Sequence, residues 1–276
     1  MQDFLKNYTN YLLEYKSNLI DYIEDEGYKL LYDKALSLSN TSDNKIITPN
    51  VSKIGDYYIK IMDSDEKKFY DIFEGHHELS KFTVKILDYY TIDKLYSCTL
   101  KNNIYLCLLK DNGVNVNTYI NSNNSDNISE IFDKIFKIID IFMDFGYISL
   151  DTSFKNFLIS DDNVYAIDFE KDFMYKIQSD SDEILMIIYI QLFIDSYNLQ
   201  NYHIIEQIIT KQLLKKFDIS NLRNKLKYII NKSINEYYEF NCNNKYYTLG
   251  YYLNYYFGEN DDVQTIDQLC SIILNN

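Results

Sequence analysis

The chain has 276 residues, a mass of 33.0 kDa and a formal net charge of −14. With 46% hydrophobic and 16% aromatic residues, it is too apolar for a disordered chain, and it is long enough for one large domain or two lobes. The negative charge disfavours nucleic acid and anionic membrane surfaces as main partners.

The longest mainly apolar run, residues 184–194, is shorter than the roughly 18 to 20 residues that cross a bilayer. The N-terminal residues also lack the apolar core of a signal peptide, so we expect a cytoplasmic protein without a membrane partner. The four cysteines have no metal-ligand spacing and are expected to be buried, reduced thiols. The sequence does not determine the oligomeric state.

Hydrophobic periodicity predicts a mixed first part of the chain. Apolar residues at helical spacing predict an N-terminal helical segment, and a polar run follows it. The expected elements after it are an extended segment at 45–62, a helix at 66–82, and strands at 94–100 and 104–110. The three residues "KNN" between the last two runs predict a hairpin with a three-residue loop.

The second part is expected to be mainly helical. Helices are predicted at 128–145, 182–197, 201–217, 220–239 and 262–274, whereas the run "YYTLGYYLNYYF" is ambiguous. The whole chain is therefore expected to be of the α+β class. Its parts are an N-terminal helical segment at 1–44, a small mixed domain at 45–112 with an antiparallel sheet and one helix, and a larger helical domain at 113–276.

A cluster of acidic and amide side chains interrupts the helical part. The runs "FLI" and "VYAI", separated by "SDDN", predict a hairpin whose open end brings Asn156 and Asp168 together. Asp151 lies close enough in sequence to face the same space. An amide oxygen and a carboxylate so placed suit Mg²⁺, and the third group could orient a hydroxyl nucleophile. Alternatively, Asp and Asn gather here because they tolerate turns, and spacing alone does not separate the two interpretations.

The motif resembles a known family. Asp151, four residues, Asn156, an apolar run and a short strand ending in Asp168 and Phe169 are similar to the catalytic loop and metal-binding motif of the protein-kinase-like superfamily. Glu170 stands in place of the usual glycine, so the ending is more similar to aminoglycoside and choline kinase-like phosphotransferases. The resemblance implies a two-lobed fold, with a small N-lobe and a larger, mainly helical C-lobe.

The resemblance also implies roles for these three residues. Asp151 would be the catalytic residue that accepts or orients the substrate hydroxyl. Asn156 and Asp168 would hold the Mg²⁺ that bridges the phosphates of ATP.

Three further residues are implied in nucleotide binding. Lys60 in "YYIKI" matches the strand lysine that contacts the α- and β-phosphates, and its expected partner is Glu74, with Glu78 as the alternative. Gly55 is the only glycine close before Lys60, where a glycine-rich turn would approach the phosphates.

The function implied is transfer of the γ-phosphate of ATP to a hydroxyl of a small molecule or a protein. Only 13 residues separate Asp168 from Asp182, and so short a segment favours a small molecule. The alternative is a catalytically weak or inactive pseudokinase that acts as a nucleotide- or protein-binding scaffold, because Ser149 and Leu150 replace the His-Arg pair of typical protein kinases. A third interpretation is a helical interaction protein, which the absence of a five-stranded sheet in the first part would favour.

Overall fold

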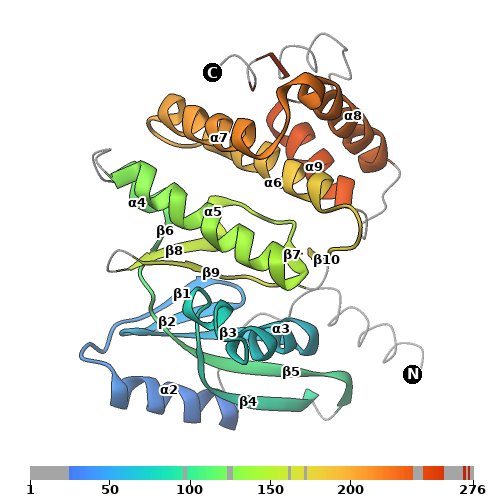
Figure 1. The fold of residues 1–276 in the computed structure, drawn as a ribbon. Helices are drawn as coiled ribbons and strands as arrows, with labels where there is room; N and C mark the ends of the chain where they lie inside the picture. Colours follow the sequence, from blue (N-terminus) through green and yellow to red (C-terminus); the bar gives the residue numbers. More distant parts are fainter. Residues whose placement is uncertain are drawn as a thin grey trace. The chain divides into compact units, whose positions relative to one another are not determined.

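The structure is a computed structural model. It describes residues 25–95, 98–122, 127–160, 163–170, 173–238, 245–257, 270, 271 and 273. Its internal contacts divide the chain into unit 1, Met1–Asn112, and unit 2, Gly113–Asn276. Unit 1 is a mixed α and β structure, whereas unit 2 is mainly helical with short strands (Figure 1).

Unit 1 contains a five-stranded antiparallel sheet with strand order β1-β2-β3-β5-β4. Its elements are α2 (Glu26–Leu38), β1 (Asn44–Thr48), β2 (Val51–Ile54), β3 (Tyr57–Asp63), α3 (Ser64–Glu74), the short 3-10 helix η2 (Leu79–Lys81), β4 (Ile86–Leu95) and β5 (Cys98–Lys110). The expected α+β class, with an antiparallel sheet in the N-terminal part, is confirmed. Residues 1–24 of the expected N-terminal helical segment lie outside the described residues.

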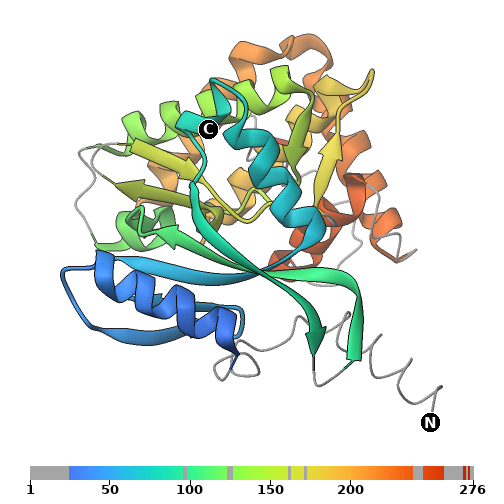
Figure 2. The same ribbon diagram turned by 90° about the horizontal axis from the view of Figure 1, so that it is seen from below.

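Successive side chains of β3 point to opposite faces of the sheet of unit 1, and the two faces differ in character. Ile59 and Ile61 are buried in the core beneath α2, which supplies Tyr28 and Leu31 from one side of the helix. Figure 2 shows α2 lying across this face of the sheet. Lys60, between the two isoleucines, points to the opposite face and contacts Glu66 on α3. One face of the sheet is thus apolar, while the other carries charged side chains.

Three expectations for unit 1 are wrong in detail. The helix expected at 66–82 begins at Ser64 and ends at Glu74, and only the short 3-10 helix η2 follows it. The segment 45–62 is not one extended run but three strands with tight turns between them. The hairpin of β4 and β5 turns between Leu95 and Cys98, so the "KNN" residues lie within β5. Pairing of Ile92 with Ile104 buries both side chains, and this packing overrides the local preference of the Asn residues for a turn.

In the described part of unit 2, short strands and two helices come first, and the helices α6 to α9 follow. Its elements are β6 (Val114–Asn115), α4 (Val116–Ser122), α5 (Ile128–Phe145), β7 (Tyr147–Ser149), the 3-10 helix η4 (Phe154–Asn156), β8 (Phe157–Ser160), β9 (Asn163–Ala166), β10 (Met174–Lys176), α6 (Ser181–Ser196), α7 (Tyr202–Lys216), α8 (Ile219–Tyr238) and α9 (Lys245–Phe257). The ambiguous "YYTLGYYLNYYF" run is helical, as part of α9. The helix expected at 262–274 lies largely outside the described residues.

The core of unit 2 is built from α5 and α6. Apolar residues of α5 recur every three or four positions and are buried, and the helix ends at Gly146, whose φ of 87° requires a residue without a Cβ. Nearly all of α6 is buried, and it packs against α7, α8 and α9. The apolar run at 184–194 is therefore a core helix. No helix among the described residues has the length and hydrophobicity needed to cross a bilayer.

Two small antiparallel sheets contain the strands between α5 and α6, and β6 joins one of them. One has the order β6-β8-β9, and the other pairs β7 with β10. The hairpin of β8 and β9 is the one expected from the sequence, with Phe157 opposite Ala166. The loop that contains Asp151 runs from β7 to η4 and so connects the two sheets.

Candidate functional site

The candidate site lies at the open end of the β8–β9 hairpin in unit 2. The backbone N–H of Ile167 donates to the carbonyl oxygen of Asn156 at 2.9 Å, which continues the pairing of the strands to their ends. Asp151, Asn156 and Asp168 line one pocket of about 510 Å³. The other residues that line it are Ser153, Lys155, Phe173, Tyr247, Thr248, Tyr251 and Tyr252. The structure thus brings together the three residues that the motif suggested.

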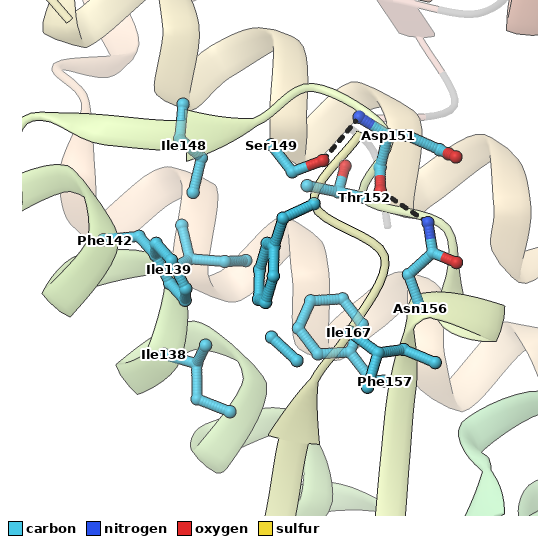
Figure 3. Close-up of a pocket in the computed structure, with 12 residues that line it drawn as sticks. Ile138, Ile139, Phe142, Ile148, Ser149, Asp151, Thr152, Asn156, Phe157 and Ile167 are labelled. Atoms are coloured by element: carbon cyan, nitrogen blue, oxygen red, sulfur yellow. Dashed lines mark hydrogen bonds between the residues drawn. The ribbon is translucent and has the colours of Figure 1, made fainter. Parts of the chain in front are cut away.

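Asn156 is oriented by the loop of Asp151. Its side-chain Nδ2 donates to the carbonyl oxygen of Asp151 at 3.0 Å (Figure 3). Because this bond uses the nitrogen, the Oδ1 atom of Asn156 is turned away from the loop. An amide oxygen held in this way is suited to accept a hydrogen bond or to bind a cation.

The loop of Asp151 is fixed by two buried polar residues of α6. The carboxylate of Asp195, which is 2% exposed, accepts from the backbone N–H of Phe154 at 2.8 Å and from Ser153 Oγ at 3.2 Å. Thr152 Oγ1 donates to Gln191 Oε1 at 2.8 Å. Bonds to a buried, charged acceptor are stronger than neutral ones, so α6 holds this loop rigidly.

Gln191 and Asp195 were not identified from the sequence. They lie four residues apart, one turn along α6, and are the polar members of a strongly apolar run. A buried polar residue needs a hydrogen-bond partner. Their helical spacing within "IYIQLFID" was therefore an available signal that this helix supports a polar loop.

Asp168 has an unusual backbone conformation. Its φ is 67°, in the left-handed region that few residues other than glycine adopt, although Asp tolerates it better than most. The next residue, Phe169, is buried, and its ring centroid lies 5.6 Å from that of Phe142 on α5. The chain turns at Asp168, which places Phe169 in the core while Asp168 lines the pocket.

The floor beneath the loop of Asp151 is apolar. Side chains of Ile138, Ile139 and Phe142 from α5, together with Ile148 from β7, surround a cavity of about 20 Å³ (Figure 3). A cavity of this size holds at most a water molecule, so the floor is closely packed. The positions of Asp151 and Asn156 are thus supported by a rigid core.

Tyr252 of α9 is bonded to Asp151. Its hydroxyl donates to Asp151 Oδ1 at 2.7 Å. Burial and the neighbouring charge of Asp151 raise the pKa of Tyr252 far above its usual value, so its hydroxyl stays protonated. This contact was not expected, because the sequence of α9 did not distinguish a helix from other structures.

Lys60 in unit 1 forms an ion pair with Glu66, at 2.5 Å between Nζ and Oε1. Both side chains are mostly buried, with 13% and 3% exposed. The expected pairing with Glu74 is wrong, as is the alternative with Glu78. Glu74 pairs with Lys85, and Glu78 pairs with His77 and Lys81, all with largely exposed side chains.

The start of α3 explains this correction. Asp63 ends β3 and caps α3, accepting hydrogen bonds from the backbone N–H groups of Asp65 and Glu66. Helix α3 therefore begins directly after the strand, and its first turn brings Glu66 to Lys60. Glu74 lies at the other end of the helix.

Gly55 lies in a tight turn rather than in a glycine-rich loop. It lies in the two-residue turn between β2 and β3 with a φ of 55°, where a Cβ would collide with Ser39 and Thr41. Its backbone N–H donates to the carbonyl oxygen of Asp43 at 2.7 Å. This amide is already bonded within unit 1, and the approach of Gly55 to a phosphate stays a prediction.

The site offers few ligands for a metal ion. Across the described part of the chain, no group of three or more His, Cys, Asp or Glu side chains could hold one. Asn156 and Asp168 together supply an amide oxygen and a carboxylate to the same pocket. Such a pair fits Mg²⁺, which keeps several waters and takes further oxygen ligands from substrate phosphates.

No protein-family model and no curated protein matches this chain. Assignment of a function therefore depends on the residues themselves and on their geometry.

Proposed function

We propose that this protein is an ATP-dependent phosphotransferase with a kinase-like fold, in which unit 1 corresponds to the N-lobe and unit 2 to the C-lobe. The observation that carries the proposal is that Asp151, Asn156 and Asp168 line one pocket, and that Asp195 of α6 fixes the loop between Asp151 and Asn156. Phosphoryl transfer depends mainly on positioning and on charge stabilisation. Such support of Asp151 and Asn156, beside Asp168 in the same pocket, is what that chemistry requires.

Each residue of the pocket has a proposed role. The carboxylate of Asp151 orients the acceptor hydroxyl and takes its proton. Asn156 Oδ1 and the Asp168 carboxylate hold Mg²⁺, which neutralises charge on the phosphates of ATP. In unit 1, Lys60 contributes a positive charge to the α- and β-phosphates. Its ion pair with Glu66 fixes the position of the ammonium group.

A small molecule is the favoured acceptor. The pocket of about 510 Å³ falls within the range of roughly 300 to 1,000 Å³ that is common for small-molecule sites. The segment between Asp168 and α6 is short and contains only the small strand β10, which leaves little chain on which a peptide could lie. A protein acceptor remains the alternative substrate.

A pseudokinase is the second candidate function. It is favoured by Gly55, whose amide is used in a turn, and by Ser149 and Leu150 at the positions before Asp151. Such a protein would keep the pocket as a binding site without transferring phosphate. The third interpretation, a helical interaction protein, is disfavoured by the five-stranded sheet of unit 1.

Mg-ATP binding tests the proposal directly. Thermal unfolding of the full chain is measured with ATP, with Mg²⁺ and with both, because a ligand that binds the native state raises the unfolding temperature by mass action. We expect stabilisation by Mg-ATP, and Asp168→Asn should weaken the affinity at least tenfold, or about 1.4 kcal/mol. The matched control is Asp140→Asn, which alters an exposed ion pair with Lys216 on other helices.

Activity separates the two candidate functions. Loss of ATP is followed together with phosphate transfer to a panel of aminoglycoside, amino-alcohol, sugar and protein acceptors. Binding without any transfer or hydrolysis would favour the pseudokinase. Equal Mg-ATP affinity in folded Asp168→Asn and wild-type protein would contradict the metal role of Asp168. Absence of Mg-ATP binding would refute the phosphotransferase and any pseudokinase that binds nucleotide.

A further inference from the structure

The hydrogen bond between Tyr252 and Asp151 has the geometry of an acceptor hydroxyl and its general base, in addition to supporting the loop. Tyr252 Oη lies 2.7 Å from Asp151 Oδ1 and donates its proton to that oxygen. A general base must lie within hydrogen-bond reach of the proton that it removes. The hydroxyl of Tyr252 therefore has the same relation to Asp151 that an acceptor hydroxyl would have.

Helix α9 holds Tyr252 in this position. Leu249 and Leu253, on either side of Tyr252, are buried, and α9 packs against α6 and α8. Gly250 approaches α8 so closely that a Cβ there would collide with the carbonyl oxygen of Ser233. Tyr252 is thus presented to the pocket by a firmly packed helix rather than by a loose loop.

We propose that Tyr252 is a site of self-phosphorylation, at which Asp151 assists transfer of the γ-phosphate of ATP to the tyrosine of the same chain. This inference rests on the proposed phosphotransferase function. In the transfer, a bond forms between Tyr252 Oη and the γ-phosphorus. The bond from the γ-phosphorus to the β–γ bridging oxygen breaks, the phenolic proton passes to Asp151, and ADP leaves.

The composition of the pocket supports this assignment. Asn156 and Asp168, the proposed ligands of the phosphate-bound cation, line the same pocket as Tyr252. The raised pKa of Tyr252 keeps its hydroxyl protonated, so its reaction needs a base, and Asp151 is in place to serve as one. Tyr251 lines the pocket as well but is 51% exposed, and the bond to Asp151 comes from Tyr252.

The test is to incubate the full wild-type chain with Mg²⁺ and γ-labelled ATP and to locate the label by peptide mass spectrometry. We expect label on Tyr252, approaching one phosphate per chain. Its first-order rate should not depend on protein concentration, because donor site and acceptor belong to one molecule. Asp151→Asn should slow labelling at least about 100-fold, the lower range of general-base effects.

Two tyrosine variants serve as a matched pair. Tyr252→Phe should abolish the label at this position, whereas Tyr228→Phe, which alters an exposed tyrosine on α8, should be labelled like wild type. Mapping on the wild-type chain does not depend on the folding of either variant.

Three outcomes would overturn the inference. ATP turnover or transfer to another acceptor without label on Tyr252 would refute it while leaving the proposed function intact. Labelling of Tyr252 at a rate proportional to protein concentration would show transfer between molecules and refute the assignment to the same chain. Absence of both Mg-ATP binding and label would refute this inference and the proposed function together.

Discussion

Replacement of Asp195 by Ala removes the carboxylate that holds the loop of Asp151 against α6. Asp195 is 2% exposed, and its Oδ2 accepts from the N–H of Phe154 at 2.8 Å and from Ser153 Oγ at 3.2 Å. Without the carboxylate, the N–H of Phe154 stays in a region that excludes water. An unsatisfied buried donor is costly because its hydration is lost without replacement.

The expected loss of stability follows from these two bonds. A hydrogen bond to a charged group contributes about 1.5 to 3 kcal/mol, and two bonds to one carboxylate are not fully additive. We therefore expect Asp195→Ala to lower the free energy of unfolding by about 3 kcal/mol. Asp195→Asn keeps one acceptor oxygen for the N–H of Phe154 and should lose about half as much.

Urea unfolding measures these differences, followed by far-UV circular dichroism and by tyrosine fluorescence, since the chain has 29 Tyr and no Trp. The control is Asp140→Ala, which breaks an exposed ion pair with Lys216 and should lose no more than about 1 kcal/mol. If Asp195→Ala is no less stable than this control, the buried carboxylate does not hold the loop and the reasoning fails.

Three further predictions concern other parts of the chain. Lys60→Met leaves the buried carboxylate of Glu66 without its cation and should lower the free energy of unfolding by about 3 to 5 kcal/mol in urea unfolding. The double variant with Glu66→Gln should recover most of this loss, and an equal loss in both variants would refute the pairing. Burial raises the pKa of Cys107 from 9.0 to about 12, so above pH 9 the unfolded state releases a proton that the native state keeps. Stability should then fall by about 1.4 kcal/mol per pH unit from this group alone, and Cys107→Ala should show a correspondingly shallower fall between pH 9 and 11. Asp151→Asn should leave Mg-ATP affinity nearly unchanged while lowering turnover at least about 100-fold, and parallel loss of both would argue against its proposed role.

The sequence by itself determined features that depend on local spacing. Apolar residues every three or four positions defined α5, and two short apolar runs around a polar turn defined the β8–β9 hairpin. Asn156 and Asp168 could be selected because a hairpin brings the residue before its first strand close to the residue after its second. Asp151 was added because it lies five residues before Asn156, and the family resemblance favoured a functional role for all three. Each of these conclusions needs only neighbours within about 20 residues.

Other features became visible only in the tertiary structure. The turn between β4 and β5 depends on pairing of Ile92 with Ile104, which packing fixes against the local turn preference of "KNN". The partner of Lys60 depends on how α3 packs beside β3: Glu74 was selected from its spacing before Leu79 and Phe82, whereas the first turn of the helix brings Glu66 to Lys60.

The contacts around Asp151 show most clearly why such features could not be predicted from the sequence. Asp195 reaches Phe154 across 41 residues of sequence, and Tyr252 reaches Asp151 across 101. Periodicity tells which face of a helix is buried, but it carries no information on which distant helix covers a given loop. Only the packing of α6 and α9 decides that a carboxylate and a tyrosine hydroxyl meet this loop.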